Sequence, residues 1–193
     1  MNKLLLAALI LICSSENIVF GHAAIVANPQ GLLVPRGSGF AEKTGPCGVM
    51  PGTITPLPRS ANVTFLKTGQ QITLSWTEMI KHPGHFVISL SQAGSKNFVP
   101  LTGFDNIPEN PALPAPAKYS ATLTVPNTVC TDCTIQLIQV MTETNPPSNY
   151  YSCTDITIST IVQPQPPMSV DPTPTPAPNQ SKPGQVDTTH KCN

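Results

Sequence analysis

The segment Q-I-T-L-S-W at residues 71–76 carries the clearest pattern in the chain. Polar and apolar residues alternate along it, so that Ile72, Leu74 and Trp76 share one face. A period of two is that of a β-strand with one buried side. The turn signal K-T-G-Q at 67–70 separates this strand from a shorter run at 63–66. We therefore expect paired strands here, with Trp76 in the core.

Further strand-like runs follow at residues 86–90, 119–125, 134–142 and 155–162. No segment has a helical period of useful length, and the 23 prolines favour turns and loops over long helices. Residues 22–62 and 103–118 have no sustained period and are expected to be loops. The pattern predicts an all-β chain: an antiparallel β-sandwich of the immunoglobulin or fibronectin III kind, with long loops.

The first 21 residues have the composition of a signal peptide. Lys3 supplies the positive end, an apolar run covers residues 4–13, and Val19 and Gly21 fit the small residues before a cleavage point. The run is too short to span a membrane. The sequence therefore predicts a secreted protein, extracellular or periplasmic, whose mature chain begins at His22. Lipidation of Cys13 is the weaker alternative, because Ile12 stands where a small residue is expected.

The remaining chain divides at residue 162. Residues 22–162 have the size of one domain, about 140 residues. Residues 163–193 hold eight prolines and almost no large apolar residues, which predicts a disordered tail. Charged residues make up 10% of the 193 and cancel to zero. This balance argues against a nucleic-acid partner and against electrostatic docking to a membrane. We expect a monomer.

Five cysteines follow the leader, and export would place them in an oxidising compartment. Cys130 and Cys133 form a C-x-x-C pair, for which a local disulfide is favoured over a redox or zinc motif. Cys47 and Cys153 are then the natural long-range pair. Cys192 in the tail is left over, with another chain or nothing as its partner.

The histidines suggest a metal site. His22 would be the first mature residue, while His82 and His85 lie in H-P-G-H-F at 82–86, and His190 lies in the tail. An N-terminal histidine offers an α-amine of low pKa and a ring nitrogen from one residue. With a second imidazole it makes a three-nitrogen set, which favours Cu(II). The alternative is that these are ordinary loop histidines.

Four segments together resemble the lytic polysaccharide monooxygenases and their relatives with a chitin-binding type-4 domain, most closely a bacterial group described as polysaccharide monooxygenase-like. The first is the histidine directly after the leader, and the second is G-P-C-G at 45–48. The third is W-T-E-M-I-K-H-P-G-H-F at 76–86. The fourth is C-T-D-C-T-I-Q-L-I-Q-V-M at 130–141, followed by Y-Y-S-C-T-D-I at 150–156.

The resemblance implies roles for individual residues. His22 matches the N-terminal copper ligand, and His82, which begins H-x-G, matches the second ligand of a histidine brace. Tyr150 matches the axial aromatic residue, and Cys153 matches a cysteine that pairs with the N-terminal loop, consistent with Cys47. His85 is the runner-up to His82; its expected place is behind the ligands, and the alternative is an ordinary surface histidine.

The resemblance implies a secreted copper protein that oxidatively cleaves or binds chitin or cellulose-type glycans, using an external electron donor. Where the family often has Gln or Glu near the metal, this chain has Ser148, and Glu78, Gln136 and Gln139 are candidate replacements. Glu78 could equally be a solvated strand residue. Aromatic residues are only 5% of the chain. Two alternatives therefore stay open: a non-catalytic copper-binding protein for metal uptake or delivery, and a metal-free carbohydrate-binding sandwich.

Overall fold

The computed structural model describes residues 22–37, 41–161 and 163–165. The predicted leader and most of the predicted tail, with His190 and Cys192, lie outside these residues. Within them every regular element is a β-strand. Accordingly, the described part of the chain contains no helix long and apolar enough to cross a membrane.

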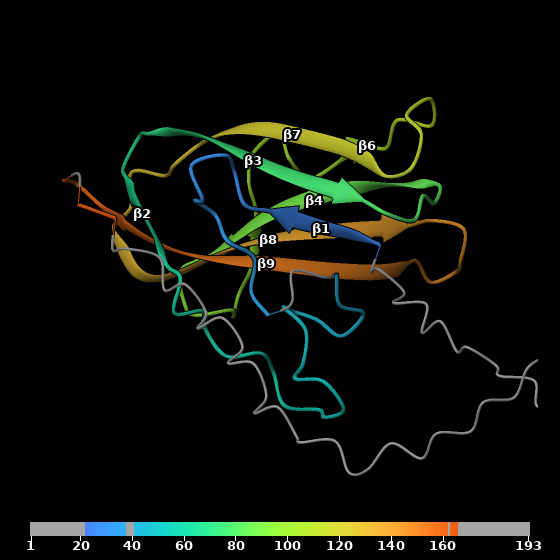
Figure 1. Ribbon diagram of the computed structural model, residues 1–193, viewed down its shortest axis with the longest axis horizontal. Helices are drawn as coiled ribbons and strands as arrows, with labels where there is room; N and C mark the ends of the chain where they lie inside the picture. Colours follow the sequence, from blue (N-terminus) through green and yellow to red (C-terminus); the bar gives the residue numbers. More distant parts are fainter. Residues whose placement is uncertain (1–21, 38–40, 162, 166–193) are drawn as a thin grey trace, which may run out of the picture.

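Two sheets face each other (Figure 1). The smaller sheet has the order β1-β3-β7, and the larger has the order β2-β9-β8-β4-β5, with β6 also paired to β4. The strands are β1 Ala23–Val26, β2 Thr64–Lys67, β3 Gln71–Glu78, β4 Gly84–Ser91, β5 Val99–Pro100, β6 Ile107–Pro108, β7 Ala117–Thr124, β8 Cys130–Met141 and β9 Ser148–Ser159. All pairings are antiparallel except that of β2 with β9. The expected all-β sandwich is confirmed.

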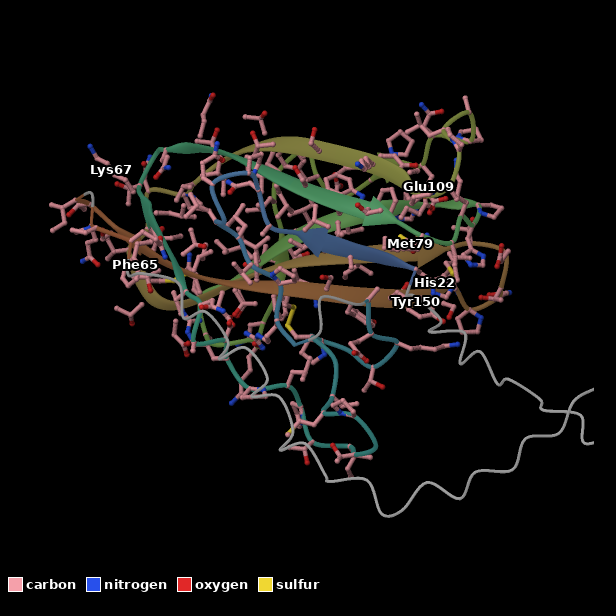
Figure 2. The ribbon with its side chains drawn as sticks, in the orientation of Figure 1. His22, Phe65, Lys67, Met79, Glu109 and Tyr150 are labelled. Carbon is pink, nitrogen blue, oxygen red and sulfur yellow. A yellow bond between two sulfur atoms is a disulfide. The ribbon has the colours of Figure 1, made fainter. Side chains whose placement is uncertain are left out.

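The outer edge of β2 is closed by side chains. Gln165 accepts a hydrogen bond from the Phe65 N–H and donates one to the Val63 carbonyl, at 3.0 and 2.8 Å. Gln70 accepts from the Lys67 N–H at 2.9 Å. Phe65 and Lys67 lie at the end of the sandwich away from His22 (Figure 2). These side-chain amides occupy positions where another strand could pair, which protects the edge from such pairing.

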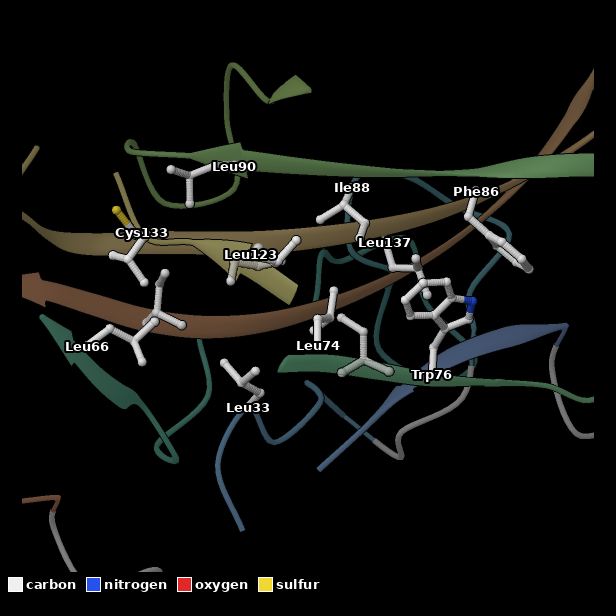
Figure 3. Packing of buried hydrophobic residues seen from close by; sticks show 14 of the residues in the cluster. Leu33, Leu66, Leu74, Trp76, Phe86, Ile88, Leu90, Leu123, Cys133 and Leu137 are labelled. Atoms are coloured by element: carbon white, nitrogen blue, oxygen red, sulfur yellow. The ribbon is translucent and has the colours of Figure 1, made fainter. Parts of the chain in front are cut away.

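The alternating segment at 71–76 forms most of β3, as expected. Leu74 and Trp76 point into the sandwich and are 0% and 1% exposed. The Trp76 ring stacks on Tyr119 of β7, with centroids 5.6 Å apart, and meets Phe86 of β4 edge-on at 5.4 Å. Figure 3 shows this cluster continuing through Ile88. Burying each large side chain contributes about 1.5–3 kcal/mol, so this face holds the two sheets together.

The expectation that residues 103–118 are loop was wrong in part, because Ile107–Pro108 form β6 and β7 begins at Ala117. Two further expectations, both about strands that reach the end of the sandwich near His22, were also wrong. Residues 22–62 are not all loop, because Ala23–Val26 form β1 and pair with Ser75–Glu78 of β3. The last strand begins at Ser148 rather than Asp155, because the polar run before Asp155 pairs along its whole length with β8. Both corrections lengthen the sheets at the end where His22 lies.

The long segment between β1 and β2 is fastened to β9. The carboxylate of Asp155, 0% exposed, pairs with the guanidinium of Arg36 and accepts a hydrogen bond from the Ser60 N–H at 2.7 Å. Two positions earlier on β9, Cys153 forms a disulfide with Cys47, with Cα atoms 5.4 Å apart. A second disulfide joins Cys130 and Cys133 at the start of β8. The Arg36–Asp155 pair and the Cys47–Cys153 disulfide fix the β1–β2 segment, which has little core of its own.

Candidate metal centre

His22 immediately precedes β1, so strand pairing determines where its backbone lies. The Met79 N–H donates a hydrogen bond of 2.6 Å to the His22 carbonyl. The next residue, Ala23, is fully buried and is the register partner of Glu78 at the end of β3. His22 is therefore held at the end of the smaller sheet.

His82 lies in the turn between β3 and β4, and the close packing of β4 on β8 explains why a glycine stands at position 84. A Cβ at Gly84 would lie 1.9 Å from the Val140 carbonyl oxygen of β8, so only glycine permits this close pairing. On the other side of the contact, the Thr142 N–H and hydroxyl both donate to the Pro83 carbonyl, at 2.9 and 3.0 Å. The backbone beside His82 is therefore held by the turn that follows β8.

Tyr150 reaches the same place from β9. Its ring stacks on the His22 imidazole with centroids 3.5 Å apart and 23° between the planes. The His82 ring lies on the imidazole of His22 at 4.7 Å and 21°. Figure 2 shows His22 and Tyr150 at the same end of the sandwich. The Lys43 ammonium stands 5.8 Å from the centroid of the Tyr150 ring. The structure thus brings together His22, His82 and Tyr150, which are far apart in the sequence.

Two ring nitrogens at this site are buried and have no hydrogen-bond partner. They are Nδ1 of His22 and Nε2 of His82. A buried polar atom without a partner costs free energy, so such atoms need an explanation. The other nitrogen of His82, Nδ1, lies 2.6 Å from the Glu143 carboxylate. Imidazole nitrogens are donors that suit copper among the transition metals.

Burial lowers the pKa of the His22 imidazole, and the neighbouring charges of His82 and Lys43 lower it further, against an opposing effect of Glu143. The neutral ring, which is the form that binds a metal, is therefore favoured. Within the described residues, no group of three or more His, Cys, Asp or Glu side chains could hold a metal ion. A site here needs a donor beyond the two imidazoles.

A buried polar cluster lies behind His22. Glu78 is 0% exposed and accepts hydrogen bonds from Gln139 at 3.0 Å and from the Tyr119 hydroxyl at 2.9 Å. The same amide nitrogen of Gln139 lies 3.2 Å from Glu109. Burial raises the pKa of the Glu78 carboxyl; the hydrogen bond from Tyr119 opposes this, and the charge of Glu109 adds to the increase. Burial also raises the pKa of Tyr119 to about 12.

This cluster decides between the candidates that could replace the missing Gln or Glu at position 148. The interpretation of Glu78 as a solvated residue is wrong, because its side chain is buried. Gln139 is the register partner of Tyr150, whereas Gln136 is the partner of Cys153 and donates to the Pro46 carbonyl at 2.6 Å. Gln136 therefore serves the loop region, and Glu78 and Gln139 are the candidates near the candidate site.

His85 lies on β4, next to the buried Phe86 and therefore on the opposite face of the sheet. Its register partners are Val140 of β8 and Pro108 of β6. The structure therefore gives His85 a position on the outer face of the larger sheet.

A cavity of about 480 Å³ adjoins His82. It is lined by Lys81, His82, Pro83, Gly84, Glu109 and Pro111. The Lys81 ammonium donates to the carbonyls of Asn110 and Leu113, at 2.5 and 2.7 Å, and so holds the far wall in place. The site therefore has a hollow on the side of Glu109.

Glu143 and Glu109 were not among the residues expected from the sequence. Glu143 follows β8 in a polar turn, T-E-T-N-P-P at 142–147, where a carboxylate has no periodic or motif signal. Glu109 lies in a proline-rich loop. The pairing of β8 with β4 places the turn after β8 next to Pro83. Only knowledge of this pairing could have shown that Glu143 lies near His82.

Comparison with known proteins gives a consistent result at the level of the family. Residues 25–156 match the family described as lytic polysaccharide mono-oxygenase, cellulose-degrading. A search of curated proteins gave no match.

Several solved structures are similar to the chain. One is the cellulose-active enzyme CelS2 in complex with copper, which is 22% identical in sequence. The match covers 53% of this chain and 54% of that chain, with a TM-score of 0.36. Another is a lytic polysaccharide monooxygenase from Streptomyces lividans, which is 18% identical in sequence. The match covers 70% of this chain and 81% of that chain, with a TM-score of 0.38. A third, from Jonesia denitrificans, has 18% identity, 54% and 61% coverage, and a TM-score of 0.30. The chain spans about half the length of CelS2.

The family match covers most of the sandwich, from β1 into β9, and includes His82 and Tyr150. The chain belongs to the lytic polysaccharide mono-oxygenase family.

Proposed function

We propose that the mature protein, residues 22–162 after removal of a leader at 1–21, is a secreted copper protein that oxidatively cleaves or binds chitin or cellulose-type glycans. The α-amine and Nδ1 of His22 and Nε2 of His82 are the proposed copper ligands. The observation that carries the proposal is the pair of buried, unpartnered ring nitrogens in two adjacent imidazoles.

Each neighbouring residue has a part in the proposal. Tyr150 covers one face of His22 and restricts access along that side. The β1–β3 pairing and the bond from Met79 hold the His22 backbone still. Bound copper would supply one-electron redox chemistry toward an oxygen co-substrate, with electrons from an external donor. The chain's own contribution is a rigid donor set beside a hollow that His82 and Glu109 line.

The experiment uses protein secreted and trimmed to begin at His22, with N-terminal sequencing to establish the cleavage. Cu(II) titration is followed by calorimetry, and glycan products are sought by mass spectrometry with copper and reductant present. We expect tight binding of one copper ion and oxidised oligosaccharides. Two matched controls are the same chain with one extra residue before His22, and His82→Ala. Equal copper affinity in all three proteins would contradict the proposed site.

A second function, copper binding without glycan cleavage, is favoured by one observation. The exposed large apolar side chains of the described residues are aliphatic or methionine: Val26, Met50, Ile54, Ile80, Val99, Val129 and Ile161. None of these offers an aromatic ring on which a sugar could stack. Copper binding by the trimmed protein, with no oxidised product from chitin or cellulose, supports this function in uptake or delivery. Binding of glycan without any copper affinity supports the metal-free sandwich.

A further inference from the structure

The His82 imidazole has two nitrogens in different surroundings. Nδ1 lies 2.6 Å from Oε1 of Glu143, and Nε2 is buried without a partner. An ionised carboxylate can only accept a hydrogen bond, so in the neutral ring the proton resides on Nδ1. The lone pair is then on Nε2, the nitrogen that the proposed function assigns to copper. Any effect of Glu143 on the metal therefore rests on that proposed function.

The contact is supported by the backbone on both sides. Thr142, the residue before Glu143, donates two hydrogen bonds to the carbonyl of Pro83, the residue after His82. The two side chains therefore leave backbone segments that are tied together one residue away from each. Their side chains are only partly exposed, 21% for His82 and 38% for Glu143. A freely mobile surface pair would have no such tether.

We propose that Glu143 is a positioning residue for the copper site: it fixes the His82 tautomer and ring orientation and, through the imidazole, adds negative charge that favours Cu(II) over Cu(I). A carboxylate behind a metal-bound histidine raises the basicity of the ligand, and removing such a partner typically lowers metal affinity by about 10–100-fold. The competing explanation is an exposed ion pair with no effect on the metal, which contributes little to stability.

Three variants separate orientation from charge. Glu143→Ala removes both. Glu143→Gln keeps an oxygen that can accept from Nδ1–H but carries no charge. Asp105→Asn, at an exposed position on the loop before β6, removes the same charge away from the site and is the matched control. All are made in the chain that begins at His22.

The first measurement needs no metal. Nitrogen chemical shifts of the His82 ring, recorded by NMR above the ordinary imidazole pKa, report which nitrogen holds the proton. We expect Nδ1–H in the parent protein, in Glu143→Gln and in the control. Glu143→Ala should shift the proton toward Nε2, as in free imidazole in water. An unchanged tautomer in Glu143→Ala overturns the proposal, and unfolding curves establish that this variant is folded.

The second measurement is the Cu(II) dissociation constant together with the Cu(II)/Cu(I) reduction potential. We expect Glu143→Ala to bind Cu(II) about 10–100-fold more weakly, Glu143→Gln to be intermediate with a raised potential, and Asp105→Asn to match the parent. Parent-like affinity and potential in Glu143→Ala overturn the proposal while leaving the proposed function intact. Absence of copper binding by the parent overturns the proposed function itself, and the tautomer measurement still tests the effect of Glu143 on the ring.

Discussion

The imidazole of His22 lies flat against the phenol ring of Tyr150, with 3.5 Å between the ring centroids. The two residues are on different sheets, since His22 leads into β1 and Tyr150 is on β9. The stack therefore links the proposed N-terminal ligand to the larger sheet. It complements the bond from Met79, which links the same residue to the smaller sheet.

Removing this ring should loosen His22. Stacked aromatic pairs contribute about 0.5–1.5 kcal/mol beyond the burial of their area. We expect Tyr150→Ala to weaken Cu(II) binding by roughly two- to tenfold, and Tyr150→Phe to bind within about twofold of the parent because it retains the ring. Isothermal titration of the trimmed proteins measures both. A Tyr150→Phe variant as weak as Tyr150→Ala would show that the hydroxyl, and not the stack, matters.

Substitution of Gly84 should damage both the fold and the proposed metal site. The added methyl group of Gly84→Ala would meet the Val140 carbonyl at 1.9 Å, which forces β4 away from β8 beside His82. Overpacking of this kind costs typically about 1–3 kcal/mol. We expect a matching loss in the free energy of unfolding, measured with denaturant, and weaker copper binding. Gly103→Asn is the control, because a Cβ there meets nothing within 4 Å and Asn tolerates its φ of 81°.

The buried carboxylate of Asp155 should be hard to replace on its own. Asp155→Ala leaves the Arg36 guanidinium buried without its charge partner, and breaking such a pair costs about 3–5 kcal/mol. We expect a loss of that size in the free energy of unfolding. Replacing both residues, as in Arg36→Met with Asp155→Leu, should recover part of it, because no charge is then left unpaired. A double variant less stable than Asp155→Ala would argue against this account.

The Glu78 carboxyl should make stability depend on pH. Its pKa is raised in the folded protein, so the folded chain holds this proton more tightly than the unfolded chain does. The free energy of unfolding therefore falls as pH rises from the ordinary carboxyl pKa to the raised one. Four other side chains face this carboxyl: Glu109, Gln139, Tyr119 and Lys81. Glu109 is the second carboxyl group among them.

The test is Glu78→Gln, which keeps hydrogen-bonding groups toward Gln139 and Tyr119 without the ionisable proton. We expect a flatter dependence of unfolding free energy on pH in this range, measured by denaturant titration at several pH values. Asp105→Asn should leave the parent's slope unchanged. An unaltered slope in Glu78→Gln would assign the dependence to another group.

The sequence predicted the parts of the fold that have a periodic signal. Alternation at 71–76 located β3, and the apolar run at 86–90 located β4. Ala23–Val26 has four apolar residues in a Gly- and Pro-rich region, too short to distinguish a strand from a loop. The beginning of β9 was missed because Ser148 to Thr154 is mostly polar, and its side chains serve the site and the loop anchors instead of the core.

The residues of the candidate site also fall into two groups, those that a sequence motif predicts and those that it does not. His22, His82 and Tyr150 were expected from motifs, and the structure brings their rings together. The surrounding carboxylates depend on long-range pairing: Glu143 on the turn after β8, and Glu109 on a loop that reaches Gln139. No local pattern encodes such contacts, so nothing in the sequence distinguishes these two glutamates from the other acidic residues.

The position of His22 directly before a paired strand also bears on how tightly a metal could be held. Ordering one backbone residue costs about 1–2 kcal/mol, and strand β1 together with the Met79 bond has already met this cost when the protein folds. A chelate on a loose chain terminus would have to meet it at each capture. The backbone of His22 is thus already ordered when a metal ion binds, so this part of the entropic cost does not reduce the affinity.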